Sequence, residues 1–391
     1  MRDAWVAVDH GRVVATGHSA GPRGGAAGGA TEIDLGDVAI LPGLVNAHTH
    51  LELSYLQDHV PPAPAFVTWV KDVMAARRLR PDPNAPDILD AIDEAIAHAT
   101  ACGTALVGDI SNTLTTFGPL ARSRLGGIVF YELIRFNAPD PAAIVEKARQ
   151  EIDALPPAEH VRPSLAAHAP YSVAPLLLRE IKRALQHDPF APCSVHLSEA
   201  AEEVEFVKSG SGPWRRLLEQ LGAWDDRWVA PGVTPVEYLD QCGFLDGRVL
   251  AVHGVQMTLP DLARLKACGT TLVTCPRSNG HTGAGAPPLE EFYRSGVRVA
   301  VGTDSLASSP DLNVFAELAT MRALAPSVPP AHLLESATRQ GARALGFDAE
   351  FGTIEPGKRA RLLAVSIPRR TIDVEEYLVT GIVPEQLRWV E

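Results

Sequence analysis

The chain has 391 residues, of which 46% are hydrophobic and 21% charged, and its formal net charge is −12. This balance is ordinary for a globular protein with a large core, and the acidic surplus argues against the basic face that nucleic-acid binding needs. No apolar run reaches about 18 residues and the five cysteines lack Cys-x-x-Cys spacing, so we expect neither a membrane span nor a disulfide framework. A reducing, cytoplasmic location is the simplest expectation.

Short strands are predicted at both ends of the chain, at residues 4–8, 12–16, 31–35, 362–366 and 380–383. The sequence Asp9-His10-Gly11 is a hairpin turn signal between the first two strands, and residues 19–29 predict a glycine-rich loop. A segment as small as the first 40 residues cannot bury a core of its own. We therefore expect it to pair with the C-terminal strands.

Between these ends, apolar strand-like runs alternate with helical stretches. Besides the strand before His48, strands are predicted at 104–109, 127–133, 162–168, 193–196, 248–253, 271–275 and 297–304. Helices are predicted at 87–101, 142–155, 176–187, 259–268, 289–295 and 312–323, with Asp87 as the cap of the first. Eight strand-led units in succession indicate a parallel sheet, and their number suits an α/β fold of the (β/α)₈ TIM-barrel type.

Polar residues stand at the ends of these predicted strands. In an extended strand, residues two apart point to the same side, so His48 and His50 would present two imidazoles to one point. Four further strands end in His168, His196, His253 and Asp304. Each residue alone could equally be a loop or capping residue. Because catalytic groups of a barrel gather at the carboxyl ends of its strands, six at this position favour a shared site.

Imidazoles and a carboxylate together suit a catalytic zinc or iron ion with an open position for water. Such an ion lowers the pKa of water to about 7, and a carboxylate that is not a ligand is then needed to move a proton to the leaving group. Glu199 follows His196 by three residues and would face back over the strand end from a helix starting there. The acids that follow it, Glu202, Glu203 and Glu205, are interpreted as solvated.

With these residues in place, the chain resembles the amidohydrolase superfamily, in the branch of cytosine deaminases, chlorohydrolases and adenosylhomocysteine deaminases. The matching motifs are Pro42-Gly-Leu-Val-Asn-Ala-His-Thr-His50, His168-Ala-Pro-Tyr171, His196-Leu-Ser-Glu199, His253-Gly254, Cys275-Pro-Arg-Ser-Asn279, Gly302-Thr-Asp304-Ser305 and Gly352-Thr-Ile-Glu-Pro-Gly-Lys-Arg359. The resemblance covers nearly the whole chain. It implies a metal-dependent hydrolase barrel at residues 44–355 and a small β-sandwich built from residues 1–43 and 356–391.

The resemblance also implies a role for each site residue. One divalent metal ion, with Zn²⁺ expected and Fe²⁺ as the alternative, would be bound by His48, His50, His196 and Asp304. Asp304 would also take a proton from the attacking water, which His253 would orient while it stabilises the developing charge. Glu199 would protonate a ring nitrogen of the substrate and then relay a proton to departing ammonia. Strand 162–168 contains no lysine, which relatives with two metals use as a bridge, so a single ion is expected.

Further residues are expected to contact the substrate. The resemblance implies that His168 touches it and that Arg277, Ser278 and Asn279 shape the pocket. The stretches His50-Leu-Glu-Leu-Ser54, Phe66-Val-Thr-Trp69 and Asp304-Ser-Leu-Ala-Ser-Ser-Pro-Asp311 resemble the aminofutalosine deaminase group of the menaquinone pathway. From the first two stretches we predict Glu52 and Trp69 as substrate contacts.

This subgroup would act on the adenine ring of aminofutalosine, which also carries a ribose and a benzoate arm. A cation is needed for the benzoate carboxylate, and Arg135 and Arg277 are the candidates, although Arg135 could equally be a surface residue. Alternatives are a methylthioadenosine or adenosylhomocysteine deaminase and a chlorohydrolase of aromatic C–Cl bonds. A small zinc deaminase of nucleic acids is disfavoured, because Pro192-Cys193 lacks the second cysteine of that motif. We expect a small-molecule substrate and a chain that can associate as a homodimer.

Overall fold

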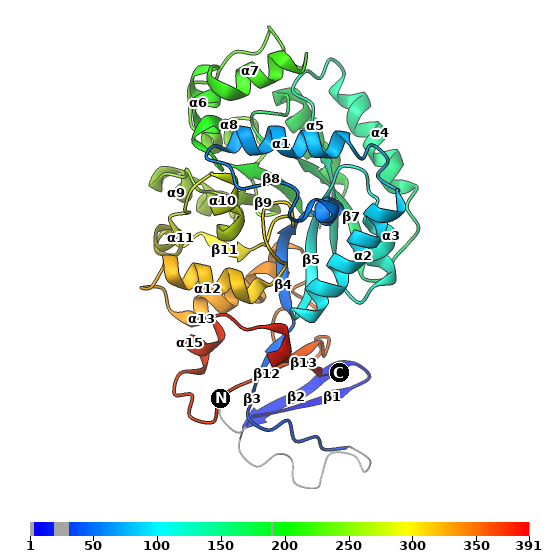
Figure 1. Cartoon of the computed structure of the whole chain (residues 1–391), viewed down its shortest axis with the longest axis vertical. Helices are drawn as coiled ribbons and strands as arrows, with labels where there is room; N and C mark the ends of the chain where they lie inside the picture. Colours follow the sequence, from blue (N-terminus) through cyan, green and yellow to red (C-terminus); the bar gives the residue numbers. More distant parts are fainter. Residues whose placement is uncertain (1–3, 19–30, 189–190, 391) are drawn as a thin grey trace.

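A computed structural model describes residues 4–18, 31–188 and 191–390. Its described part is an α/β fold in which parallel strands alternate with helices (Figure 1). The parallel strands are β4 (Leu44–Thr49), β5 (Thr104–Ser111), β6 (Gly126–Leu133), β7 (Val161–Ala167), β8 (Cys193–Leu197), β9 (Val249–His253), β10 (Thr271–Thr274) and β11 (Arg298–Val301). Seven of them agree with the predicted strands to within three residues, and the eighth is the strand predicted before His48.

The parallel strands form two sheets of four, in the orders β4-β5-β6-β7 and β8-β9-β10-β11. The sheets meet at two seams, where backbone groups join their carboxyl ends. At one seam the His196 amide donates to the His168 carbonyl at 2.8 Å, and at the other the Thr303 amide donates to the His48 carbonyl at 3.1 Å. The Asn46 side-chain amide adds a bond to the Thr303 hydroxyl at 2.7 Å. The sheets therefore close into a barrel, as the predicted fold class requires.

The barrel is filled by branched aliphatic and aromatic side chains, because its strands are buried on both faces. This inner cluster includes Val45, Leu106, Ile128, Phe130, Leu250, Val252 and Val273. Glycine allows the closest backbone approaches. A Cβ on Gly302 would lie 2.7 Å from the Cβ of His48, so only glycine fits where the end of β11 passes His48.

Helices surround the barrel, and helix α1 crosses above the carboxyl ends of the strands (Figure 1). The helices are α1 (Phe66–Arg78), α2 (Pro86–Ala101), α3 (Phe117–Arg122), α4 (Pro141–Asp153), α5 (Pro175–Ala184), α6 (Ala201–Ser209), α7 (Gly212–Gln220), α8 (Pro235–Gln241), α9 (Leu259–Cys268), α10 (Pro276–Thr282), α11 (Leu289–Ser295), α12 (Val314–Leu324), α13 (Pro330–Ser336), α14 (Arg339–Ala344) and α15 (Val374–Leu378). Short 3₁₀ segments are η1 (Leu51–Leu56), η2 (Leu185–His187) and η3 (Pro384–Gln386). The α-helices turn apolar faces toward the barrel, as in α5, where Leu177, Leu178 and Ile181 are buried.

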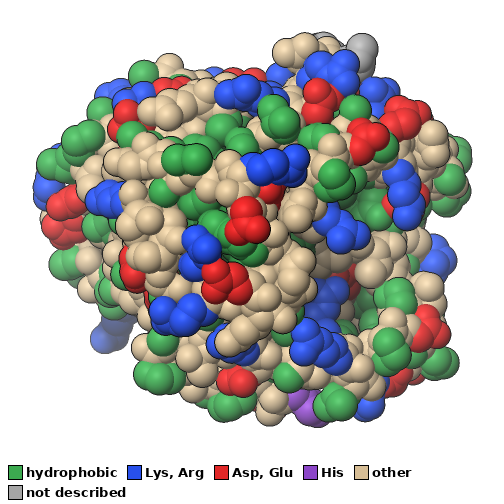
Figure 2. Space-filling view, turned by 90° about the horizontal axis from the view of Figure 1, so that it is seen from above, with side chains coloured by type: hydrophobic (Ala, Val, Ile, Leu, Met, Phe, Trp, Pro, Cys, Tyr) green, Lys and Arg blue, Asp and Glu red, His purple; other side chains and the backbone are tan. Residues whose placement is uncertain are grey.

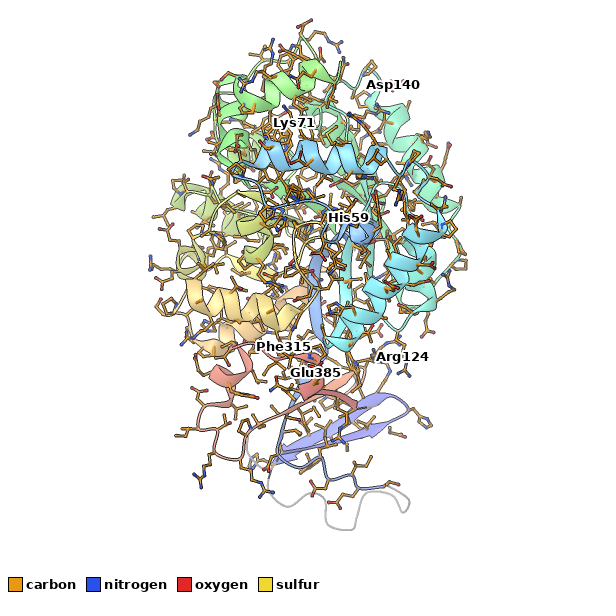
Figure 3. The ribbon with its side chains drawn as sticks, viewed as in Figure 1. His59, Lys71, Arg124, Asp140, Phe315 and Glu385 are labelled. Atoms are coloured by element: carbon orange, nitrogen blue, oxygen red, sulfur yellow. The ribbon has the colours of Figure 1, made fainter. Side chains whose placement is uncertain are left out.

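Two small sheets at one end of the molecule combine both ends of the chain. Strands β13 (Leu387–Val390), β12 (Leu362–Ser366) and β3 (Val38–Pro42) form one antiparallel sheet, and β1 (Ala4–Asp9) pairs with β2 (Arg12–His18) in a hairpin. The Val13 amide donates to the Lys358 carbonyl at 2.9 Å and links the hairpin to the C-terminal segment. In Figure 3, Glu385 marks this end, and Lys71 on α1 marks the opposite part of the molecule. The proposed boundaries at 43/44 and 355/356 remain predictions.

Several local predictions are wrong. Residues 31–35 form no strand, because the Asp34 carboxylate accepts from the Gly36 amide in a turn. Residues 380–383 form none either, since Gly381 has φ +105°, and the strand follows at 387–390. Asp87 does not cap α2, which begins with Pro86 after Ala85. The predicted loop at 19–29 lies outside the described residues.

The outer surface carries intermingled positive and negative side chains on the face seen from the top of Figure 1 (Figure 2). Within the described residues, none of the helices combines the length and the apolar character that crossing a membrane requires.

Candidate metal and catalytic centre

The six polar residues predicted at strand ends do meet at one face of the barrel. His48, His196 and His253 lie at the carboxyl ends of β4, β8 and β9, and Asp304 follows β11. His50 and His168 follow β4 and β7 directly. The ring centroid of His48 lies 4.9 Å from that of His50, 5.0 Å from that of His196 and 5.6 Å from that of His253. Residues more than 250 positions apart thus share one cluster.

The donor atoms of this cluster fit a single divalent cation. The Nε2 atoms of His50 and His196 are 3.4 Å apart, and Oδ1 of Asp304 is 3.5 Å from Nε2 of His50 and 3.8 Å from Nε2 of His48. Four ligands around zinc at about 2.0–2.2 Å lie about 3.4 Å from each other, which matches these spacings. Both ring nitrogens of His48 are buried without a hydrogen-bond partner. An orphaned buried donor set of this kind is accounted for by a bound metal ion.

The histidines of the cluster are kept neutral, as metal ligands must be. Burial, opposed in part by Asp304, lowers the pKa of His50 to about 3. Burial and the neighbouring His50 ring likewise hold the pKa of His48 well below its usual value. Burial, opposed by Asp304, also lowers the pKa of His253 to about 3. At neutral pH these rings therefore offer lone pairs rather than positive charge.

Asp304 is held as a carboxylate. Burial raises the pKa of Asp304. The His50 and His253 rings and a hydrogen bond from Ser278 lower it by more, so the net shift is downward. The Ser278 hydroxyl donates to Oδ2 at 2.6 Å, and the Ser305 amide donates to Oδ1 at 2.8 Å. These bonds orient the carboxylate toward the three histidines that share the site.

His253 is oriented by Asn279. The Asn279 side-chain amide nitrogen lies 3.1 Å from Nδ1 of His253, so Nδ1 accepts and the proton resides on Nε2. Nε2 in turn lies 3.6 Å from the Glu199 carboxylate. This tautomer lets His253 donate a hydrogen bond into the space between Glu199 and Asp304, where a developing oxyanion would need it.

Glu199 is buried beside these groups. Burial, together with the charge of the nearby Asp304 carboxylate, raises the pKa of Glu199 well above its usual value. It does not lie on a helix, as predicted, but in the turn between β8 and α6. A buried carboxyl group with a raised pKa beside a histidine is equipped to act as a general acid.

Glu203 corrects a prediction, because it is fully buried rather than solvated. Its two carboxylate oxygens accept from the backbone amides of Ser198 and Glu199, both at 2.9 Å. Ser198 has φ +53°, and His253 and Asp304 have φ +77° and +59°, so three non-glycine residues adopt left-handed backbone conformations at this site. Glu203 therefore stabilises the strained turn that presents Glu199. Its position in the first turn of α6 is the signal that could have indicated this role.

Glu132 was not predicted, although it lies near the carboxyl end of β6 and the other site residues lie at strand ends too. Its Oε1 lies 3.4 Å from Nδ1 of His196, which also contacts the His168 carbonyl at 2.9 Å. Both contacts favour a proton on Nδ1 of His196 and leave Nε2 as the metal-facing atom. His168 itself is held by a 2.6 Å contact between its Nδ1 and the Ser172 hydroxyl, and burial together with Arg77 lowers its pKa to about 4.

The pocket-shaping residues that follow β10 act differently from one another. Ser278 and Asn279 are buried and hold Asp304 and His253 in place. Arg277 is directed to acids instead, since its guanidinium lies 2.7 Å from Asp311 and 3.7 Å from Glu317. Its charge is therefore already matched, which argues against it as the receptor of a substrate carboxylate.

The remaining predicted substrate contacts stay predictions, and each of them has different surroundings. The Glu52 carboxylate accepts from four donors, namely Arg77, the Ser111 hydroxyl, the Asn112 amide and the Thr113 hydroxyl. Three of these bonds go to Oε2 and one to Oε1, so Glu52 holds Arg77 and the end of β5 in place. Trp69 is buried on α1, where its ring stacks on that of Phe66 with the ring centroids 6.1 Å apart. The Arg135 side chain is exposed beyond β6, as a surface residue would be.

Sequence comparison identifies relatives over most of the chain. The aminodeoxyfutalosine deaminase of Deinococcus radiodurans is 33% identical over 327 residues, which cover 80% of this chain and 74% of that protein. A 5-methylthioadenosine/S-adenosylhomocysteine deaminase of Moorella thermoacetica is 30% identical over 383 residues, covering 93% of this chain and 83% of the other. Both relatives are named as deaminases.

Structure comparison agrees with these relatives. The aminofutalosine deaminase of Helicobacter pylori, solved with methylthio-coformycin, superposes with a TM-score of 0.82 at 25% identity, covering 100% of this chain and 93% of that one. An adenosine deaminase of Xanthomonas campestris with bound zinc has a TM-score of 0.80 at 25% identity, covering 99% and 86%. The protein is thus an enzyme that hydrolyses C–N bonds with a divalent metal ion. Because the sequence pattern of the amidohydrolase family matches residues 39–379, the chain belongs to that family.

Proposed function

We propose that the protein deaminates the adenine ring of aminofutalosine, an intermediate of the menaquinone pathway, with release of ammonia. The observation that carries the proposal is the buried Glu199, whose carboxyl group has a raised pKa and lies 3.6 Å from Nε2 of His253, within a cluster suited to one metal ion. A proton donor there suits a ring nitrogen, which must be protonated before the exocyclic amino group can leave. The similarity to the aminodeoxyfutalosine deaminase of Deinococcus radiodurans supports the choice of substrate.

The roles of the chain's own groups follow from their geometry. Glu199 donates its proton to the ring nitrogen and, once ionised, carries a proton from the water to the departing ammonia. Asp304, ionised and oriented by Ser278, accepts the first proton from the water. His253, with its proton on Nε2, donates a hydrogen bond to the oxygen as it attacks the ring carbon.

His48, His50 and His196, together with Asp304, would hold a divalent cation, which when bound would lower the pKa of water to about 7. We propose Zn²⁺ rather than Fe²⁺, because imidazole nitrogens with one carboxylate in four-coordinate spacing suit zinc. The zinc in the Xanthomonas campestris enzyme supports the same choice.

A second candidate is deamination of methylthioadenosine or adenosylhomocysteine, which the name of the Moorella thermoacetica relative favours. The two candidates share the adenine ring and differ in the group attached to the ribose. They would therefore share every catalytic residue named above and differ in residues that contact the distal part of the substrate. A cytoplasmic location is part of the proposal, and the five unpaired cysteines support a reducing compartment.

The test is a deaminase assay on purified protein of known metal content. Loss of the adenine ultraviolet signal is followed with aminofutalosine, methylthioadenosine, adenosylhomocysteine and adenosine. We expect a preference for aminofutalosine and a fall in kcat of about 10²- to 10⁴-fold in Glu199→Gln with unchanged metal content. Glu202→Gln, in the first turn of α6 just after Glu199, is the matched control and should keep its activity.

A preference for one of the other nucleosides would overturn the substrate and keep the mechanism. Near-normal turnover by Glu199→Gln would overturn the assignment of the general acid. No adenine deamination by metal-loaded protein would overturn the proposed function as a whole.

A further inference from the structure

The ring of His50 has less support than those of the other metal-side histidines. Its side chain is 14% exposed, whereas that of His48 is fully enclosed. Nδ1 of His196 contacts Glu132 and a backbone carbonyl, but among the described residues no hydrogen bond reaches Nδ1 of His50. Because ligating histidines are usually oriented through this second nitrogen, the placement of His50 must come from the backbone that carries it.

The regular pairing of β4 with β5 does not extend to this backbone. The pair of Asn46 with Val107 is followed by the pair of Thr49 with Asp109. Three residue steps on β4 thus match two on β5, so β4 carries an extra residue here. Such an irregularity bends a strand and disrupts its hydrogen bonding locally. His50 lies between the last of these pairs and the start of η1, where the sheet gives it no support.

The side chain of Asp109 supplies the missing support. Asp109 lies opposite Thr49 in β5 and is fully buried, and its Oδ1 accepts from the Leu51 amide at 2.8 Å. Its Oδ2 accepts from the Thr116 hydroxyl at 2.5 Å, which fixes the direction of the carboxyl group. Among the described residues no cation pairs with Asp109, so these two hydrogen bonds must offset the cost of burying it. The amide that it holds belongs to the residue directly after His50.

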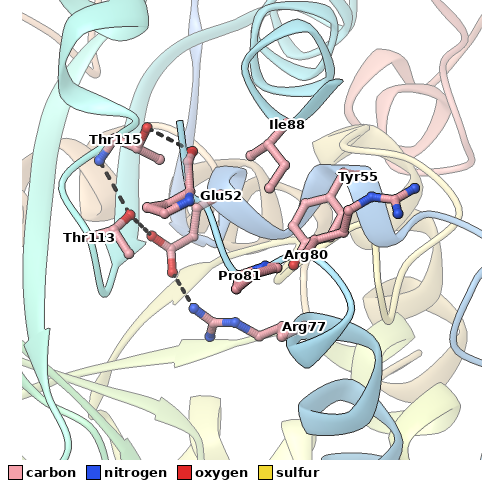
Figure 4. Close-up of a pocket in the computed structure, with 9 residues that line it drawn as sticks. Glu52, Tyr55, Arg77, Arg80, Pro81, Ile88, Thr113 and Thr115 are labelled. Atoms are coloured by element: carbon pink, nitrogen blue, oxygen red, sulfur yellow. Dashed lines mark hydrogen bonds and ion pairs between the residues drawn. The ribbon is translucent and has the colours of Figure 1, made fainter. Parts of the chain in front are cut away.

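Glu52 holds the same segment through its side chain (Figure 4). Its carboxylate accepts from the Thr113 hydroxyl at 2.9 Å and from Arg77 at 3.1 Å, so it joins η1 to the loop after β5 and to α1. Together with Asp109, these bonds fix two successive residues of η1 to β5 and the loop that follows it. A chain segment fixed in this way has little freedom to carry His50 away from the other ligands.

We propose that Asp109 is the positioning residue for the metal ligand His50 and that it acts through the Leu51 amide. The inference goes beyond the proposed function, because it holds for any substrate of this metal centre. With the backbone held in this way, Nε2 of His50 lies 3.4 Å from Nε2 of His196 and 3.5 Å from Oδ1 of Asp304, which is the spacing of ligands around one ion. Without Asp109 the buried Leu51 amide would lose its acceptor, and His50 could leave this arrangement.

The test measures the affinity for Zn²⁺ by competition with a chelator in Asp109→Ala and Asp109→Asn. We expect the Kd for Zn²⁺ to rise about 10- to 100-fold in the alanine variant, the loss typical when the support of a metal ligand is removed. The asparagine variant keeps an oxygen for the Leu51 amide and should bind Zn²⁺ nearly as well as wild type. Asp261→Ala is the matched control and should leave the Kd unchanged. Asp261 is also buried and accepts from the Thr258 amide and the Thr234 hydroxyl, neither of which adjoins a metal ligand.

Two further measurements separate positioning from stability. The melting temperature of the metal-free protein should fall in both alanine variants, since each loses the hydrogen bonds of a buried acid. The visible spectrum of Co²⁺ bound in place of Zn²⁺ reports the ligand arrangement and should change only in Asp109→Ala. Equal Zn²⁺ affinities in folded Asp109→Ala and Asp261→Ala would overturn the inference, and so would a loss in Asp109→Asn as large as in Asp109→Ala. If Asp109→Ala does not fold, Thr116→Val, which removes only the hydroxyl that directs Oδ2, should raise the Kd, and a wild-type Kd there would overturn the inference.

Discussion

Some residues of this site could be predicted from their position in the chain, and others could not. The metal-side histidines, Glu199 and Asp304 follow apolar strands, and that context predicted them. Glu203 was misjudged because a run of acids after a strand is usually solvated, and only the fold shows its carboxylate buried under the Ser198–Glu199 turn.

The buried Glu203 predicts a pH dependence of stability. Burial, opposed by the Ser198 and Glu199 amides, raises its pKa to about 8, above a value near 4.5 in the unfolded chain. The folded protein therefore holds a proton that the unfolded chain releases, so its contribution is full below about pH 4.5 and is lost as the pH rises to about 8. Between these limits we expect wild type to lose about 1.4 kcal/mol per pH unit relative to Glu203→Gln. Urea unfolding at pH 5, 6.5 and 8 measures the difference, and parallel curves would contradict it.

At the scale of elements, strong local signals predicted boundaries well. Helix α9 was predicted at its observed bounds, because Thr258 and Asp261 form a capping box at its start and Gly269 ends it in a left-handed conformation. Helix α1 was not predicted, although it covers the barrel face that holds the site (Figure 1). The short helices α6 to α8 were missed as well, because their lengths of seven to nine residues give little periodicity.

The closure of β11 on β4 predicts a steric requirement at Gly302. An alanine Cβ there would lie 2.7 Å from both the Cβ and the carbonyl oxygen of His48, so either β11 or His48 must shift. We expect Gly302→Ala to lower the free energy of unfolding by about 1–3 kcal/mol and to weaken zinc binding in a chelator competition. Gly280→Ala, where nothing lies within 4 Å of the added Cβ, is the control and should affect neither. Unchanged zinc affinity in the first variant would show that this seam does not position His48.

For the whole molecule, the metal site ties together the two halves of the barrel. His48 and His50 come from β4 in one sheet, whereas His196 and Asp304 come from β8 and β11 in the other. Metal binding should therefore be coupled to global stability.

Removal of the metal ion by a chelator should lower the melting temperature by about 3 °C, if the free ion had exceeded its Kd about 100-fold. Added Zn²⁺ should restore it, and differential scanning calorimetry measures both. Glu199→Gln, which leaves the ligands intact, should respond like wild type, and His48→Asn should not respond. A melting temperature that is insensitive to the chelator in metal-loaded wild type would contradict this coupling.

The sequence by itself determined the barrel, the strand-end histidines and the family, because period, strand order and short motifs are local properties of the chain. Only the tertiary structure decided how these residues act on one another. It showed that Asn279 sets the tautomer of His253, that Glu203 supports the turn of Glu199 and that Glu52 accepts hydrogen bonds from Arg77 and Ser111. Burial, hydrogen-bond partners and pKa values depend on contacts between residues far apart in the chain, which no local pattern records.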